Sequence, residues 1–149
     1  MSFLSIPLRS NGQRFFHDWF NSLRTAGVSI ETFLGSGFMQ ETSFALANNQ
    51  IVAANVTGLS FNSASYKSAH IYTEVRRKTD SNEAVSNGIL RVMYKDSSSA
   101  WILIDELGGD DDGITFSITT GGQIQYTSND LLGTNYSGKV TFKAITFSA

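Results

Sequence analysis

The chain lacks cysteine and has little charge, and both absences limit what it can do. None of its 149 residues is a cysteine, so disulfides and thiolate zinc sites are excluded. Two residues are histidines, His17 and His70, and one is a proline. Charged residues make up 16% of the sequence, below the value of about 25% that is usual for a globular domain. No apolar run approaches the length of about 20 residues that a membrane-spanning helix needs.

These shortages exclude several classes of function. The net charge of −2 gives no general attraction to polyanions, so we expect neither nucleic-acid binding nor membrane insertion. The opening residues 1–8, MSFLSIPL, have no basic start, and they do not read as a signal peptide. We therefore expect a soluble protein. No G-x-S-x-G or H-E-x-x-H motif occurs, and we expect no enzymatic activity and no cofactor.

Residues 14–27, RFFHDWFNSLRTAG, form the single clear amphipathic helix of the sequence. Ser10 and Gln13 have the spacing of a capping box, and Gly27 is suited to end the helix. Large apolar residues share one arc of this helix, and we predict that they dock or oligomerise the chain; they are Phe15, Phe16, Trp19, Phe20 and Leu23. Their rings must be buried against the chain's own sheet, sister subunits or a larger assembly, and we favour partners outside the chain.

From residue 41 the apolar pattern changes from a helical period to a period of two. Eight short alternating stretches separated by turn-rich segments predict eight strands, at residues 41–46, 53–61, 68–78, 88–95, 100–107, 113–119, 123–128 and 138–148. Many short strands without long helices between them favour an antiparallel β-sandwich, jelly-roll-like, after one N-terminal helix. We place the boundary after residue 38, with a helical docking segment over 1–38 and the β-sandwich domain over 39–149.

The hairpins of this sandwich allow the strand register to be predicted. A four-residue loop at residues 96–99 sets Tyr94 opposite Trp101 and Val92 opposite Leu103, on one face. A three-residue loop at residues 120–122 pairs Ile118 with Ile124 and Phe116 with Tyr126, and it predicts a glycine at positive φ. In the last strand Val140 and Phe142 point one way while Ile145 and Phe147 point the other. That strand therefore either has a bulge near residues 143–144 or is covered on both faces.

Acidic residues supply the sharpest candidates for a chemical site. Three consecutive aspartates, Asp110, Asp111 and Asp112, precede Gly113, but consecutive carboxylates point in different directions and chelate a metal poorly. We favour a solvated turn over a metal site here. Asp105 and Glu106 are neighbours in a predicted strand and face opposite sides, which defeats the paired geometry of a glycoside hydrolase.

Other polar residues have an interpretation that does not involve a site. His70 shares the outward face of its strand with Tyr72 and Glu74, and we expect it to be an ordinary surface histidine. In the run of residues 76–78, RRK, we expect the first and third residues to share a face and to guard the edge of a sheet against aggregation. The tyrosines that we expect to be exposed would offer rings to sugars; they include Tyr66, Tyr72 and Tyr136.

Three stretches together resemble a known group of proteins. Residues 18–35, DWFNSLRTAGVSIETFLG, lead into residues 41–61, ETSFALANNQIVAANVTGLSF, and the chain closes with residues 113–149. These stretches resemble small virion structural proteins of tailed bacteriophages, of the tail-fibre, head-fibre or decoration type. The resemblance implies a short N-terminal attachment segment, a β-rich body, trimers and no catalytic residues.

Two functions follow as expectations. The first is a non-enzymatic virion protein, assembled in the host cytoplasm, whose helix docks to other capsid or tail proteins or to sister subunits while the sandwich faces outward. This protein would be a homo-oligomer, with a trimer favoured. The alternative is a carbohydrate- or receptor-binding module at a fibre tip, with a host surface glycan as its partner.

Overall fold

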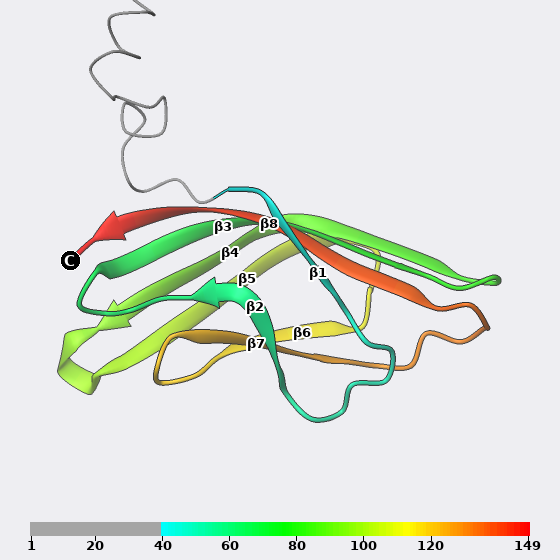
Figure 1. Ribbon diagram of the computed structural model, residues 1–149, viewed down its shortest axis with the longest axis horizontal. Helices are drawn as coiled ribbons and strands as arrows, with labels where there is room; N and C mark the ends of the chain where they lie inside the picture. The colour runs from blue at the N-terminus through cyan, green and yellow to red at the C-terminus, as the bar shows by residue number, and fades with distance from the viewer. Residues whose placement is uncertain (1–39) are drawn as a thin grey trace, which may run out of the picture. The chain divides into compact units, whose positions relative to one another are not determined.

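A computed structural model describes residues 40–149, and these residues form eight antiparallel strands (Figure 1). The strands are β1 (Thr42–Ala45), β2 (Ala54–Ser60), β3 (Tyr66–Lys78), β4 (Glu83–Lys95), β5 (Ala100–Gly109), β6 (Ile114–Ile118), β7 (Gln123–Ser128) and β8 (Ser137–Ser148). A 3₁₀ turn, η2 (Asp96–Ser98), joins β4 to β5. The predicted helix with its docking residues lies outside the described residues, and so does His17. The predicted docking segment over residues 1–38 lies outside them as well.

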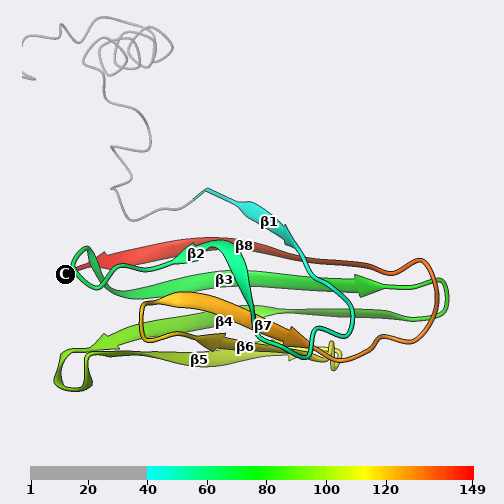
Figure 2. The ribbon, with the colours of Figure 1, turned by 60° about the horizontal axis from the view of Figure 1, so that its bottom comes forward.

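The strands divide into two sheets that face each other. The larger sheet has the order β1-β8-β3-β4-β5 and the smaller has the order β2-β7-β6, with every neighbouring pair antiparallel. Figure 2 shows the long strands β8, β3, β4 and β5 side by side, with the smaller sheet laid across them. The mainly-β, antiparallel fold is therefore confirmed. The finer jelly-roll description stays a prediction, because the division is into sheets of five and three strands.

The core fills the space between the sheets because side chains alternate along each strand. In β3 the residues that point inward include Ile71, Thr73 and Val75, all buried, while the residues between them face outward. The facing sheet contributes Ile124 and Tyr126. The remaining large members of the core are Leu46, Val56, Leu59, Phe61, Leu90, Val92, Trp101, Phe116, Val140 and Phe142. One contiguous core thus explains the period of two in the sequence.

Both predicted hairpin registers are confirmed. Tyr94 lies opposite Trp101 with ring centroids 5.4 Å apart, and Val92 lies opposite Leu103. In the second hairpin Ile118 pairs with Ile124 and Phe116 with Tyr126.

Gly122 is the glycine at positive φ that this loop requires, at +86°. A Cβ on Gly122 would come within 2.0 Å of the carbonyl oxygen of Phe61, so the position tolerates no side chain.

The start of β4 differs from the prediction. Residues 80–88, DSNEAVSNG, are rich in turn formers and suggest a loop, but β4 begins at Glu83 and pairs with β3 from there. Ala84 and Ser86 are buried, so the pattern of alternation extends five residues earlier than the composition indicates. Turn formers are tolerated in this strand because the pairing with β3 supplies tertiary contacts that outweigh local propensity.

Two other expectations about the larger sheet are settled by the register. The pairing of β8 with β3 runs without a shift through Lys143 and Ala144, so no bulge separates the two apolar sets of β8. Phe147 is 47% exposed, so its face of β8 is open in the described part of the chain. The expectation that residues 76–78 guard a sheet edge is wrong, because β3 is the central strand of five.

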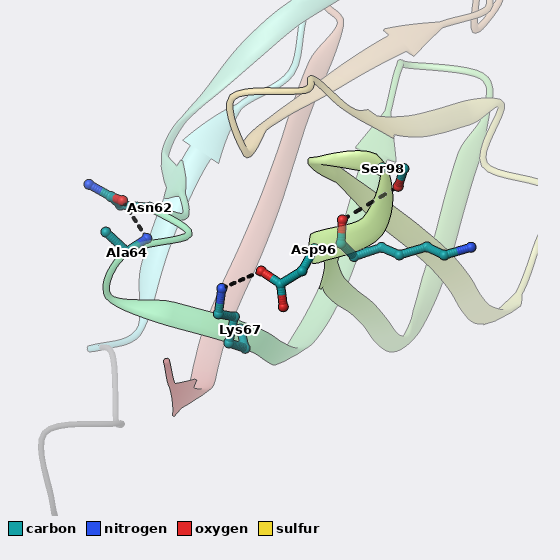
Figure 3. A network of polar contacts seen from close by, with 6 residues as sticks. Asn62, Ala64, Lys67, Asp96 and Ser98 are labelled. Atoms are coloured by element: carbon teal, nitrogen blue, oxygen red, sulfur yellow. Dashed lines mark hydrogen bonds and ion pairs between the residues drawn. The ribbon is translucent and has the colours of Figure 1, made fainter.

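Polar contacts hold the end of the sandwich where β3 begins (Figure 3). Lys67 Nζ lies 2.8 Å from Asp96 Oδ1 in η2 and 4.8 Å from the centroid of the Tyr94 ring. In the loop before β3, Asn62 Oδ1 accepts a hydrogen bond from the amide of Ala64 at 2.8 Å. The first residues of β3 are thus tied to the turn between β4 and β5.

Candidate functional site

The two sheets present different outer faces. On the three-stranded sheet the outward side chains are all small or medium polar groups without charge, namely Asn55, Thr57, Thr115, Ser117, Gln125 and Thr127. Gln125 Nε2 donates to Asn55 Oδ1 at 2.8 Å, which links the two side chains across the strands. This face is what a solvated sheet surface is expected to look like.

The outer face of the five-stranded sheet exposes large apolar side chains instead. Five of them are 39–47% exposed and lie together over β3, β4, β5 and β8, and we call them the apolar patch: Tyr72, Met93, Ile102, Ile104 and Phe147. The register sets Phe147 opposite Ser68, Ser68 opposite Met93, and Met93 opposite Ile102, so one row crosses four strands. Among residues 40–149 no element packs on this face.

Charges at the patch are paired. Arg91 lies beside Ile104 in the register, and its Nη2 is 2.7 Å from Glu106 Oε2. The Nε of Arg91 is buried and has no hydrogen-bond partner. The ring of His70 contacts Phe147 edge-on at 5.4 Å. The expected outward placement of His70 with Tyr72 is thereby confirmed.

A groove of about 660 Å³ adjoins the patch on the same face and crosses β1, β8, β3 and β4. Its lining combines two aromatic residues, the exposed Tyr72 and the buried Phe142, with polar groups of both charges. These polar groups include Ser43, Glu74, Asn87, Thr141 and Lys143. Glu74 Oε1 accepts from Arg76 Nε at 2.5 Å, and this pairing raises the pKa of the Arg76 guanidinium above its ordinary value. The groove is therefore of mixed polarity, and Tyr72 is its exposed aromatic residue.

Each of the three aspartates before Gly113 accepts a hydrogen bond from a backbone amide. Asp110 Oδ2 accepts from the amide of Val85 at 3.0 Å, and Asp111 Oδ1 accepts from the amide of Gly113 at 3.1 Å. Asp112 is buried and accepts from the amide of Ile114 and from Ser86 Oγ. The interpretation as a solvated turn is therefore wrong for Asp112. No group of three or more metal-ligating side chains occurs within residues 40–149.

Asp105 and Glu106 face opposite sides, as their spacing predicts. Glu106 lies on the outer face with Arg91, and Asp105 Oδ1 accepts from the amide of Leu107 at 3.0 Å. The two carboxyl groups therefore do not converge on one site.

Sequence reasoning missed the buried arginine of β3. Arg77 is 1% exposed, and its guanidinium donates to Asn48 Oδ1, to the carbonyl oxygens of Asp112 and Asn129, and to the hydroxyl of Tyr136. The only signal in the sequence is the alternation of β3, which places Arg77 on the inward side between two outward cations.

The tyrosines expected to be exposed differ from one another. Tyr72 is exposed, at 47%, while Tyr66 and Tyr136 are half-buried. The ring of Tyr136 lies 5.5 Å from the Arg77 guanidinium carbon, so this tyrosine packs in the network around Arg77 rather than offering a face to solvent. Of the three, Tyr72 is the one placed to contact a ligand.

Comparisons with known proteins place few limits on the function. No family model and no curated protein sequence matches the chain. A solved structure, that of the Acinetobacter phage vB_ApiP_P1 tailspike protein, is similar over 72% of this chain with 15% identity and a TM-score of 0.43. The match spans about a fifth of the tailspike chain, 21%, and the likeness is too distant to assign a function. Within the described residues no helix has the length and apolar character needed to cross a bilayer.

Proposed function

We propose that the chain is a non-enzymatic structural protein of a bacteriophage virion, of the fibre or decoration type. The observation that supports this best is the apolar patch on the outer face of the five-stranded sheet. Contiguous exposed apolar surface is typical of surfaces that bind a partner. The outer face of the three-stranded sheet has no such surface and carries uncharged polar side chains instead. The phage assignment rests on the resemblance of residues 18–61 and 113–149 to small virion proteins.

In this proposal the predicted helix at residues 14–27 attaches the protein, as a homo-oligomer with a trimer favoured, to other virion proteins. The sandwich is the part displayed on the particle. A sandwich with few charged side chains is suited to display at different salt concentrations, because few of its interactions are ion pairs that salt screens.

The experiment is mass spectrometry and electron microscopy of intact particles that carry the gene for this chain. We expect the protein in purified particles, and we expect Trp19→Ala to reduce its incorporation because the change removes a large ring from the predicted docking arc. Asn21→Ala, on the opposite arc of the same helix, is the matched control and should incorporate normally. Particles without the protein would refute the virion assignment, and normal incorporation of Trp19→Ala would refute this docking arc.

A carbohydrate-binding role is the second candidate, and the groove beside the patch favours it. Tyr72 offers a ring on which a sugar could stack, while Glu74 and Asn87 offer hydrogen-bonding groups beside it. We expect binding on a glycan array that Tyr72→Ala abolishes and that Tyr66→Ala, outside the groove lining, leaves intact. A clean negative across the array would count against this role.

A further inference from the structure

We propose that the apolar patch is the contact surface for a second copy of this chain, with two five-stranded sheets stacked face to face about a two-fold axis. This inference adds a partner, a second copy of the chain, to the proposed function. It rests on the proposed function only in placing that contact on a virion. It is tested on the purified protein, whereas the virion assignment is tested on particles, so either can fail alone.

The chemistry of the patch matches itself. Its five members are aliphatic, thioether or aromatic, and they lie on adjacent strands in consecutive rows of the register. Met93 lies near the middle, between the ring of Phe147 on β8 and the isoleucines of β5. A two-fold axis through this region would set apolar side chains against apolar side chains, because the same surface is used by both copies.

Two of the cations near the patch already have a partner in the same chain. Arg91 is neutralised by Glu106 at 2.7 Å and Arg76 by Glu74 at 2.5 Å, both within one chain. Burial of an unpaired charge is strongly unfavourable, so charges paired in advance lower the free-energy cost of covering the face. Two copies also repel each other little, since each carries a net charge of −2.

The whole outer face of the five-stranded sheet, which carries both the patch and the groove, is large enough for a stable pair. Four strands at about 4.8 Å spacing, each of about 12 residues at about 3.3 Å, give a footprint of roughly 700–800 Å². A standard interface buries about 800 Å² on each partner. Stacked sheets lie about 10 Å apart, which leaves room for the side chains of both copies to interdigitate.

Analytical ultracentrifugation of the full-length chain gives the first test. We expect an even number of chains in each oligomer: two if this face makes the only contact, or six if it joins two of the trimers favoured in the proposed function, with 16.3 kDa for each chain. Met93→Lys and Phe147→Lys should each weaken association at least about tenfold, because each buries a charge without a partner. Ser117→Lys, on the outer face of the smaller sheet, is the matched control and should associate like the unaltered chain.

The two lysine variants also separate face-to-face contact from side-by-side pairing of the edge strand β5. Phe147 lies on β8, which is separated from β5 by β3 and β4. Pairing through the β5 edge would be insensitive to Phe147→Lys, and that result would overturn the proposal. Circular dichroism of each variant verifies the fold, and both side chains are exposed enough for the change to be accommodated in one chain.

The absence of cysteine makes a single-cysteine experiment decisive. We expect two chains that carry Met93→Cys to be cross-linked to each other through the introduced thiols by a short bismaleimide, and Ser117→Cys to remain uncross-linked. A monomer whose introduced thiol reacts freely would overturn the proposal. A monomer whose thiol is protected would also overturn it, because the patch would then be covered by part of the same chain. An odd-numbered oligomer without the cross-link would overturn it as well.

Discussion

Arg77 shows how much one residue can hold together in this sandwich. It is buried, and its acceptors come from the segments before β2, before β6, after β7 and before β8. Arginine serves here because its planar fork of donors reaches several acceptors at once, which lysine does not. The neighbouring Arg76, one residue earlier and on the opposite face, bonds only to the surface residue Glu74 among the contacts described.

The first prediction concerns this pair of arginines. Arg77→Met should lower the free energy of unfolding by about 3–5 kcal/mol, because it leaves several buried acceptors without a donor. Arg76→Met removes an exposed ion pair and should cost less than about 1 kcal/mol. Urea unfolding of both variants measures the difference. Equal losses would contradict the role assigned to Arg77.

A second residue-scale prediction concerns acid stability. Hydrogen bonds from the Thr134 hydroxyl and amide hold the pKa of Asp80 below its ordinary value. The folded state therefore favours the carboxylate, and the stabilisation is present at neutral pH and is lost as the pH falls below about 4 through the folded-state pKa. Asp80→Asn should unfold at a lower temperature than the unaltered chain at pH 7.

The diagnostic quantity is the difference in melting temperature between Asp80→Asn and the unaltered chain. This difference should become smaller as thermal unfolding is repeated at successively lower pH, because protonated Asp80 is uncharged, as asparagine is. A difference that stays constant from pH 7 to pH 2 would show that the carboxylate charge is unimportant.

At the scale of elements, the backbones of β4 and β5 leave no room for a side chain at Gly88. A Cβ on Gly88 would come within 2.2 Å of the carbonyl oxygen of Glu106, on the backbone of β5. At Gly108, on the facing strand, a Cβ would meet nothing within 4 Å. The two glycines lie in adjacent positions of the same ladder, so they form a matched pair.

We expect Gly88→Ala to destabilise the protein by about 1–3 kcal/mol, because the backbone of β5 must shift to admit the methyl group. Gly108→Ala should be neutral or slightly stabilising, since it reduces the freedom of the unfolded chain without a clash. Chemical denaturation of both variants provides the measurement. Similar values for both would show that the ladder adapts easily at Gly88.

Strand positions were predictable because their evidence is local. Alternation along β3, β7 and β8 gives the inward and outward sets, and the loop lengths around residues 96–99 and 120–122 give the register of two hairpins. The first five residues of β4 were not predictable. Their composition is that of a turn, and pairing with β3, which is a tertiary contact, makes them a strand.

At the scale of the whole molecule, the distribution of polarity distinguishes two surfaces. The smaller sheet turns uncharged amides and hydroxyls to solvent, whereas the larger sheet exposes the apolar patch and the groove beside it. A surface of the second kind costs free energy in water unless something covers it. The molecule therefore has one face suited to solvent and one suited to a partner.

Salt dependence tests this account of the partner face. If apolar contact holds the copies together, the association should persist in 1 M NaCl, where the Debye length is about 3 Å and exposed ion pairs are screened. Sedimentation at low and high salt makes the comparison. Dissociation into single chains at high salt would indicate that ion pairs between the copies hold them together instead.

The sequence by itself determined the class of fold, the number of strands and the side of each strand that faces the core, because the period of side-chain alternation is a local property. It also placed His70 and Tyr72 on one outward face. Only the tertiary structure decided that β3 is central, that Arg77 is buried in a shared network, and that residues of β3, β4, β5 and β8 meet in one apolar patch. Those properties depend on the order in which strands pair, which joins residues far apart in the chain and leaves no local pattern in the sequence.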